Sequence, residues 1–482
     1  MIDPFRSATE LASDLRARKI GCRELLELYA ARVAQFNPTL NAIIATDFER
    51  ARRRADDADA ALAGGEVWGP LHGIPMTVKE SYDVEGFVTS WGAPEFETYR
   101  PACDALSIAR LVAAGANVFG KTNVPLFLGD LKTYNALYGT TSNPWDLTRT
   151  PGGSSGGSAA ALAAGLTALD AGSDIASSIR TPAHYCGVYG HKPTFGLVTT
   201  RGQLVPGRIG FTDIAVVGPM ARSADDLALA LQIMAGPDDI DARAWRVELP
   251  KPRKERLADF RVAVMLDAPH APVDRDVQAQ IQYLVDTAGK AGAAISYTAR
   301  PGFDTEEADH LFQRLLGAVL SGRGSEASFK AAEAAARRLS ADDTSEHAQM
   351  LRNATLSHRD WLTANETRHR MRLEWAEFFD EYDLLLCPAA ASVAPLHNHD
   401  GAPFERPITV NGKQVPLSTQ LFWAGYAGLA YLPATVAPAG ATAQGLPVGV
   451  QIIGPQYGDL TCIHFARLLE RCHRGFVAPP GY

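Results

Sequence analysis

The residues best suited to chemistry lie in two short serine-containing turns near the middle of the chain. Residues 151–158 read PGGSSGGS and residues 173–180 read SDIASSIR. The glycines of the first turn allow sharp bends, which bring backbone N–H groups close to a ligand. An Ala/Leu-rich helix is predicted at 159–164, between the two turns. A glycine-rich loop that leads into a helix N-terminus attracts anions, and the helix brings both turns into one neighbourhood.

Common nucleotide-binding and hydrolase motifs do not account for this stretch. The chain has no G-x-x-x-x-G-K-[ST] loop, no G-x-G-x-x-G followed by an acid about 20 residues later, and no G-x-S-x-G elbow. A serine hydroxyl is a weak nucleophile that needs a base. His184 and His191 lie nearest to the first turn in sequence, but neither belongs to a Ser/His/Asp motif. We interpret His191 as a structural hydrogen-bonding residue.

Several ordered motifs give the chain a resemblance to a known family. Ser154 and Ser178 are 24 positions apart (178 − 154), and residues 73–80 read GIPMTVKE. Further matches are GKTN at 120–123, NPW at 143–145, GHKPT at 190–194 and GLPVGVQ at 445–451. In these motifs the sequence resembles the amidase signature enzymes over nearly its whole length. The resemblance implies the α/β amidase-signature fold, with a central mixed β-sheet flanked by helices on both faces and a helical insertion.

The resemblance also implies a Ser–cis-Ser–Lys triad. Lys79 would take a proton from Ser154, Ser154 would take one from Ser178, and Ser178 would attack the carbonyl to form an acyl-enzyme. The family holds the peptide bond between Gly153 and Ser154 cis. Lys79 can act as a base only when neutral, so its pKa must fall below the usual value of about 10.4, and burial lowers it.

The resemblance further implies which residues hold the substrate. Leu128 and Gly129 lie where the family's substrate-binding loop crosses the site. The oxyanion is expected to meet backbone N–H groups, those of Ile175, Ala176, Ser177 and Ser178. Ala176-Ser177 replaces the glycine pair that usually precedes the nucleophile. A turn that needs φ > 0 at either position would therefore be strained, and the added side chains would narrow the carbonyl end of the pocket. Asp174 and Arg180 are expected to brace this turn.

The predicted reaction is hydrolysis of a carbon–nitrogen amide bond, and it extends to carbamates (urethanes) and esters. An apolar or aryl substrate is expected because the pocket candidates are apolar or aromatic: Trp91, Phe127, Leu128, Tyr134, Tyr138, Phe422, Trp423 and Tyr426. The alternative is a glutaminase-type subunit of a tRNA-dependent amidotransferase, although residues 305–379 show no evident acid-binding arginine motif. A non-catalytic scaffold is a third alternative, and the retention of Lys79, Ser154 and Ser178 speaks against it.

Composition limits the partners. The chain has 482 residues, is 46% hydrophobic and 21% charged, and has a net charge of −8, which indicates a soluble globular protein and argues against a nucleic-acid partner. Its six cysteines lack C-x-x-C spacing, so we expect neither a metal site nor a disulfide framework, and we expect a cytoplasmic location. We also expect no metal at His397 and His399, no cofactor and no membrane contact. The expected partner is a small amide or carbamate, and the expected oligomeric state is monomer or homodimer.

The elements that must position the site follow from local patterns. A strand at 75–79 is expected to place Lys79 at its end, and a short strand at 167–170 should lead into the second turn. Thr46 is expected to cap a helix that runs to residue 63, and Asn411-Gly412 should turn a hairpin. The βαβ rhythm predicts a substantial parallel component in one sheet. We expect one domain over 1–482, comprising an N-terminal helical segment (1–63), a catalytic core (64–300), a helical insertion or lid (305–379) and a segment that completes the core (380–482).

Overall fold

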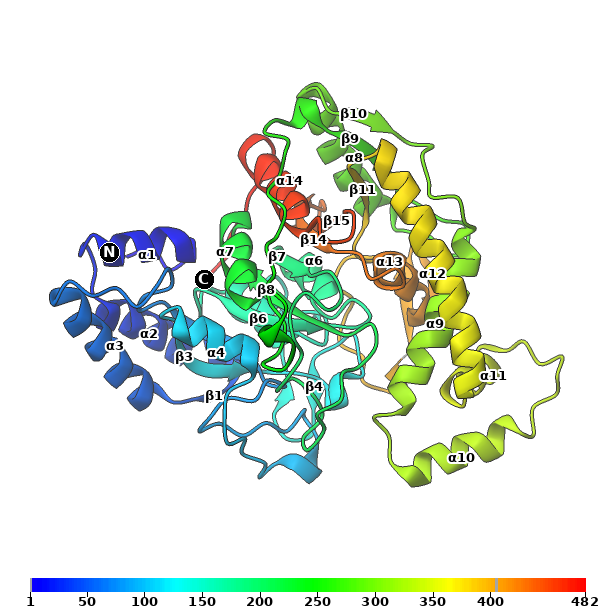
Figure 1. Cartoon of the computed structure of the whole chain (residues 1–482), viewed down its shortest axis with the longest axis horizontal. Helices are drawn as coiled ribbons and strands as arrows, with labels where there is room; N and C mark the ends of the chain where they lie inside the picture. The colour runs from blue at the N-terminus through cyan, green and yellow to red at the C-terminus, as the bar shows by residue number, and fades with distance from the viewer. Residues whose placement is uncertain (1, 404–405) are drawn as a thin grey trace.

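The computed structural model describes residues 2–403 and 406–482. An eight-stranded mixed sheet occupies its centre, in the order β10-β9-β11-β15-β14-β7-β8-β6 (Figure 1). Its strands are β6 (Asp170–Asp174), β7 (Tyr189–Lys192), β8 (Val216–Ala221), β9 (Arg261–Val264), β10 (Ala294–Ser296), β11 (Leu384–Pro388), β14 (Ala434–Ala441) and β15 (Pro447–Ile453). Among the described strands of this sheet, β9 pairs in parallel with β10 and with β11, whereas the other neighbouring strands are antiparallel. The parallel component is therefore smaller than the βαβ rhythm predicts.

Lys79 does not belong to this central sheet. It ends β2 (Pro75–Lys79), which pairs in parallel with β3 (Asn117–Thr122), and β3 pairs in antiparallel with β1 (Ile43–Thr46). The Thr77 N–H donates to the carbonyl of Leu169 at 3.2 Å, just before β6. The strand expected at 167–170 thus begins only at Asp170, where pairing with β8 starts. Lys79 and the second serine turn meet where the two sheets adjoin.

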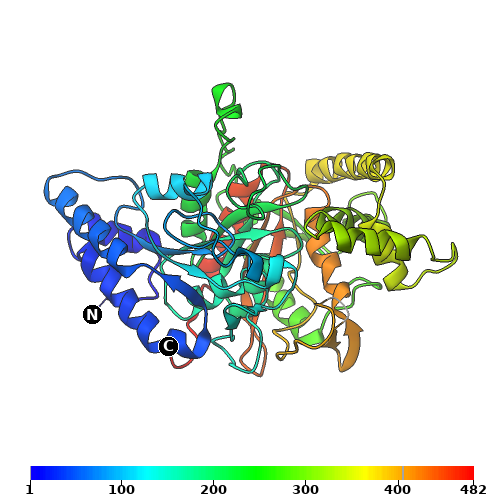
Figure 2. The ribbon, with the colours of Figure 1, turned by 90° about the horizontal axis from the view of Figure 1, so that it is seen from below.

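Helices surround both sheets, and they confirm the predicted fold class. Helices α1–α3 lie at one side of the sheets and α9–α12 at the opposite side, as both views show (Figures 1 and 2). Their bounds are α1 (Ala8–Arg16), α2 (Cys22–Leu40), α3 (Phe48–Ala63), α4 (Leu106–Ala113), α5 (Gly156–Ala163), α6 (Arg180–Cys186), α7 (Ala224–Met234), α8 (Arg275–Lys290), α9 (Thr305–Ser321), α10 (Glu326–Ala336), α11 (Glu346–Ala354), α12 (His358–Glu381), α13 (Leu421–Gly428) and α14 (Asp459–Cys472). The expected helical insertion corresponds to α9–α12. Within the described ranges, none of the helices has both the length and the apolar character needed to cross a membrane.

Local signals predict the C-terminal hairpin but not the cap at the start of α3. The cap expected at Thr46 is wrong, because Thr46 is still part of β1 and the side chain of Asp47 accepts the Arg50 N–H at 2.9 Å instead. The predicted hairpin is present as β12 (Pro407–Val410) and β13 (Lys413–Pro416). Its turn residues Asn411 and Gly412 have φ values of 53° and 75°, which is the left-handed conformation that an Asn-Gly turn favours.

The loop between β3 and the first serine turn is mostly irregular. It contains a 3₁₀ turn at Leu126–Leu128 and the two-residue strands β4 (Tyr134–Asn135) and β5 (Gly139–Thr140). Phe127 and Leu128 both have positive φ, 49° and 58°. This loop passes beside the first serine turn, since a Cβ on Gly153 would lie 2.6 Å from the carbonyl oxygen of Asp130.

Helix α5 explains why the first turn runs into so many small residues. Every residue of α5 is buried, so the helix has no solvent-facing side. A Cβ added to Gly157 would lie 2.3 Å from the backbone nitrogen of Asn123 and 2.7 Å from the carbonyl oxygen of Ala42. Both contacts are backbone atoms that cannot move aside independently. Glycine at this position therefore lets the helix approach β1 and the end of β3.

We predict that Gly157→Ala destabilises the protein even though alanine favours helices. Overpacking against fixed backbone costs about 1–3 kcal/mol, so the urea midpoint should fall clearly. The matched control is Gly210→Ala, because a Cβ on Gly210 has no neighbour within 4 Å. Circular dichroism during urea unfolding measures both variants. Equal midpoints for Gly157→Ala and the wild type would contradict this packing argument.

Candidate active site

Lys79 is fully buried at the end of β2 and contacts the first serine turn. Its Nζ lies 2.6 Å from Ser154 Oγ, 3.0 Å from Ser173 Oγ and 3.2 Å from the Ser173 carbonyl oxygen. A charged amine would donate to all three oxygens, whereas a neutral amine can accept the Ser154 hydroxyl proton on its lone pair. The protonation state of Lys79 therefore decides the direction of proton transfer.

The surroundings of Lys79 favour the neutral amine. Burial lowers the pKa of Lys79 well below its usual range, and the positive charge of Arg323 lowers it further. The carboxylates of Asp174 and Asp170 oppose this shift without overcoming it. Gln203 helps to fix the polar neighbours of the amine, because its side-chain amide donates to Ser173 Oγ at 2.9 Å. The site thus contains a buried lysine suited to act as a base.

The two serine turns meet in one pocket. The peptide bond between Gly153 and Ser154 is cis, and the Ser155 N–H donates to the Ser178 carbonyl at 3.0 Å. Ser154 and Ser178 both line this pocket. Within residues 2–403 and 406–482, Ser154 Oγ is bonded to Lys79, whereas Ser178 Oγ has no hydrogen-bond partner. Ser178 is therefore the free hydroxyl of the pair.

Asp174 and Arg180 brace the second turn, as the sequence predicted. The Asp174 carboxylate accepts Arg180 Nη2 at 2.9 Å and Nε at 3.0 Å, and it also accepts the Ile179 N–H at 3.0 Å. Burial acts to raise the pKa of Asp174, but the Arg180 guanidinium and the Ile179 N–H outweigh it and lower this pKa to about 2. The turn is thus built around an ion pair that stays charged at neutral pH.

Of the two residues that replace the usual glycine pair, one adopts the strained left-handed conformation. Ser177 has a φ of 86°, whereas Ala176 does not have positive φ. The Ser177 side chain bonds to Thr181 Oγ1 at 2.6 Å, and its N–H donates to Asp174 Oδ1 at 2.9 Å. The Ser177 N–H therefore donates to Asp174, whereas we expected it to donate to the oxyanion. In the described parts of the chain, the N–H groups of Ile175, Ala176 and Ser178 have no such acceptor.

The pocket wall is more polar than the sequence predicted. Trp91, Leu128 and Ile175 line it, but so do Gln203 and Arg323. Gly129, Ala176 and Ser177 are not among its lining residues, and Gly129 instead ends the 3₁₀ turn that carries Leu128.

The other expected aromatic residues do not line this pocket: Phe127, Tyr134, Tyr138, Phe422, Trp423 and Tyr426. Phe422, Trp423 and Tyr426 are buried in the core on α13. Tyr134 stacks on His399 with ring centroids 3.8 Å apart. No sequence motif marks Arg323, which follows α9 within SGRGS and reaches the site only through the tertiary fold.

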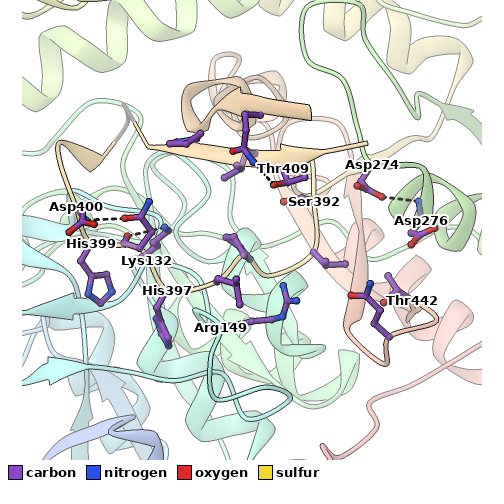
Figure 3. Close-up of a pocket in the computed structure, with 18 residues that line it drawn as sticks. Lys132, Arg149, Asp274, Asp276, Ser392, His397, His399, Asp400, Thr409 and Thr442 are labelled. Carbon is purple, nitrogen blue, oxygen red and sulfur yellow. Dashed lines mark hydrogen bonds between the residues drawn. The ribbon is translucent and has the colours of Figure 1, made fainter. Parts of the chain in front are cut away.

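A larger cavity of about 850 Å³ lies elsewhere, between Lys132, Arg149, His397, His399 and Asp274 (Figure 3). Neither Lys79, Ser154 nor Ser178 lines it. No group of three or more His, Cys, Asp or Glu residues in the described ranges is arranged to hold a metal ion. The reactive serines and this cavity are therefore separate features.

Comparisons with known proteins agree with this geometry. A family model described as Amidase matches residues 24–463. The chain is 33% identical to a glutamyl-tRNA(Gln) amidotransferase subunit from Anaeromyxobacter sp. (strain K), over 98% of this chain and 97% of that protein.

Solved structures are also similar. One, described as revealing the evolutionary origins of an s-triazine catabolic enzyme, is 28% identical with a TM-score of 0.83, over 98% of this chain and 100% of that one. A bacterial aryl acylamidase is 25% identical with a TM-score of 0.81, over 98% of this chain and 96% of that one. The chain belongs to the amidase signature family. It is an amidase-family hydrolase of carbon–nitrogen amide bonds.

We predict that activity depends on the charge of Lys79. Because protonation removes the lone pair, kcat/KM should rise with pH through an apparent pKa well below the usual lysine value of about 10.4. Lys79→Met should lose most activity, and its remaining kcat/KM should no longer show this rise with pH. Lys290→Met, at an exposed position, is the matched control and should keep the wild-type profile. An unchanged pH profile in Lys79→Met would rule out Lys79 as the base.

Proposed function

We propose that this protein hydrolyses a small-molecule amide through an acyl-enzyme on Ser178. The observation that carries the proposal is the 2.6 Å contact between buried Lys79 Nζ and Ser154 Oγ, next to the free hydroxyl of Ser178. Neutral Lys79 takes the Ser154 proton while Ser154 takes the Ser178 proton. The Ser178 oxygen then bonds to the substrate carbonyl carbon, and the carbonyl oxygen becomes an oxyanion.

The oxyanion meets backbone N–H groups. We assign this role to Ile175, Ala176 and Ser178, whose N–H groups have no acceptor elsewhere in the described chain. Ser154 then passes a proton from Lys79 to the leaving nitrogen, and the carbon–nitrogen bond breaks. Water attacks the acyl-enzyme by the same relay in reverse, which releases the acid and restores Ser178. This cycle needs no cofactor.

The wall of the pocket supports a substrate with an apolar or aryl body. Trp91, Leu128 and Leu204 all line the pocket, and each is less than 10% exposed. Burying apolar substrate surface against them contributes about 25 cal/mol per Å². Similarity to an aryl acylamidase points in the same direction. Carbamates and esters share the acyl-transfer step, so we include them in the proposed substrate range.

The second candidate function is the glutaminase-type subunit of a tRNA-dependent amidotransferase. It is favoured by the 33% identity, over nearly the whole chain, to a protein named as part of such an enzyme. Glutamine, however, brings an α-ammonium group that needs an acidic partner. Among the described residues, Asp174 is the only carboxylate that lines the reactive pocket, and this carboxylate is already paired with Arg180. We therefore rank the single-chain amide hydrolase first.

The nucleophile is tested by covalent trapping. A fluorophosphonate should label wild-type protein once, and peptide mapping should place the adduct on Ser178. Ser178→Ala should abolish labelling and lower turnover by about 10⁴-fold or more while the fold is retained, since the nucleophile and its relay act as a unit. The matched control Ser155→Ala should still be labelled at Ser178. An adduct on Ser155 or Ser177 in the wild type would overturn the assignment.

The two candidate functions are separated by substrate and by native size. The amide-hydrolase proposal expects kcat/KM for an anilide or aryl carbamate to exceed that for glutamine or asparagine by at least tenfold. It also expects this activity from the isolated chain, as monomer or homodimer on a calibrated sizing column. If glutamine is preferred by tenfold or more, the amidotransferase function replaces the first proposal.

A further inference from the structure

The reactive pocket is too small to hold a substrate by itself. Its free volume is about 20 Å³, roughly enough for one water molecule. A second pocket of about 240 Å³ adjoins it, and the two share Trp91, Leu204, Thr212 and Arg323 as lining residues. An amide whose carbonyl reaches Ser178 must therefore extend across this shared boundary. Whatever part of the substrate crosses it passes Arg323.

Arg323 lies at this boundary with most of its hydrogen-bonding capacity unused. It follows the C-terminus of α9, and its Nη1 donates to the Phe127 carbonyl at 3.2 Å. Its Cζ lies 5.7 Å from the centroid of the Trp91 ring. Within residues 2–403 and 406–482, no carboxylate oxygen lies within 4.0 Å of its guanidinium nitrogens. A guanidinium carries five N–H donors, so four have no protein acceptor in the described chain.

The acidic residue that lines the outer pocket already has partners of its own. Asp213 lines the outer pocket but pairs with Arg368 at 2.8 Å and accepts the Tyr431 hydroxyl. Burial lowers the pKa of Arg323 to about 10, so the side chain is still positively charged at neutral pH. Exposed Arg208 is a further cation on the outer pocket. The boundary therefore carries an unmatched positive charge that faces the path of the substrate.

We infer that Arg323 is a specificity-determining residue that binds a carboxylate on the substrate. This inference rests on the proposed amide hydrolysis at Ser178. The planar guanidinium fork matches a carboxylate in two parallel hydrogen bonds, whereas a neutral apolar group would leave most of the guanidinium donors without an acceptor. The substrate class is an amide with an apolar body against Trp91 and Leu204 and a carboxylate a few bonds from the scissile carbonyl.

This substrate class differs from the substrates considered so far for the two candidate functions. A purely apolar anilide lacks the group that Arg323 binds. Glutamine has a carboxylate, but its ammonium group needs an acidic partner, and the Asp174 carboxylate of the reactive pocket is already paired with Arg180. A monoanionic amide without an ammonium group satisfies the charges of both pockets. The acidic group can lie on either side of the scissile bond, so the test covers both.

The test uses substrate pairs that differ only by a carboxylate. On the acyl side, N-phenylsuccinamate is compared with butyranilide, which has a methyl group in place of the carboxylate. On the leaving-group side, 4-acetamidobenzoate is compared with 4-acetamidotoluene. For wild-type protein, kcat/KM should favour the carboxylate member of at least one pair by about tenfold or more, as expected for a charge-assisted pair. Absence of any carboxylate preference, with the neutral anilides hydrolysed, would overturn the inference.

Variants assign that preference to Arg323. Arg323→Met should remove it, because kcat/KM for the anionic substrate should fall about tenfold or more further than kcat/KM for the neutral member, chiefly through KM. Arg323→Lys should restore part of the preference. Arg314→Met, at an exposed position on α9, is the matched control. Each variant is measured on its own pH plateau, because Arg323 also lowers the pKa of Lys79.

Three results would contradict the role of Arg323. Equal losses for both members of a pair in Arg323→Met would indicate a structural role, which circular dichroism and Arg323→Lys would check. Loss of the carboxylate preference in Arg208→Met but not in Arg323→Met would assign carboxylate binding to Arg208 instead of Arg323. If calorimetry shows that Ser178→Ala protein binds neither N-phenylsuccinamate nor 4-acetamidobenzoate, the protein has no carboxylate subsite at Arg323. Binding without any hydrolysis by wild-type protein would instead refute the proposed function and leave the subsite standing.

Discussion

A buried amine next to a buried hydroxyl is the contact on which the rest of this structure depends. Lys79 and Ser154 are both fully buried, and a charged ammonium there would lose most of its hydration. Because the unfolded chain binds this proton more tightly, the lowered pKa of Lys79 reduces stability at pH values below the ordinary lysine pKa, and the reduction diminishes as pH rises toward that pKa. The small residues of α5 and the packing of β2 beside β6 provide the enclosure.

The second turn meets a different constraint, which is to aim backbone N–H groups into the pocket. The Asp174–Arg180 pair gathers the Ser177 and Ile179 N–H groups onto one carboxylate. This leaves the N–H groups on either side of Ser177 without an internal acceptor in the described chain. The left-handed conformation of Ser177 is part of the same arrangement, and its hydroxyl contact with Thr181 supports it. Replacement of the usual glycine is therefore compatible with an oxyanion site.

Much of this organisation could be predicted from local sequence. The strand that ends at Lys79 and the Asn411-Gly412 turn depend on neighbouring residues, whereas the pairing of Ser154 with Ser178 was implied by the resemblance to the amidase signature enzymes. Three features could not be predicted, because each depends on contacts between distant segments or on competition within the folded turn. Pairing with β3 places Lys79 outside the central sheet, and Asp174 competes for the Ser177 N–H. Arg323 reaches the pocket only because α9 packs beside it. A prediction based on the aromatic residues alone therefore made the pocket wall too apolar.

The central claim is that Lys79 is neutral at working pH, and its titration can be observed directly. Lysine labelled with ¹³C at Cε and ¹⁵N at Nζ gives one NMR signal per side chain, and the signal missing from Lys79→Met identifies Lys79. The account predicts that this signal titrates at a pH well below the ordinary lysine value of about 10.4, and that Ser154→Ala keeps the signal in the same buried environment. A Lys79 signal that remains that of a charged ammonium up to about pH 10 would contradict the account.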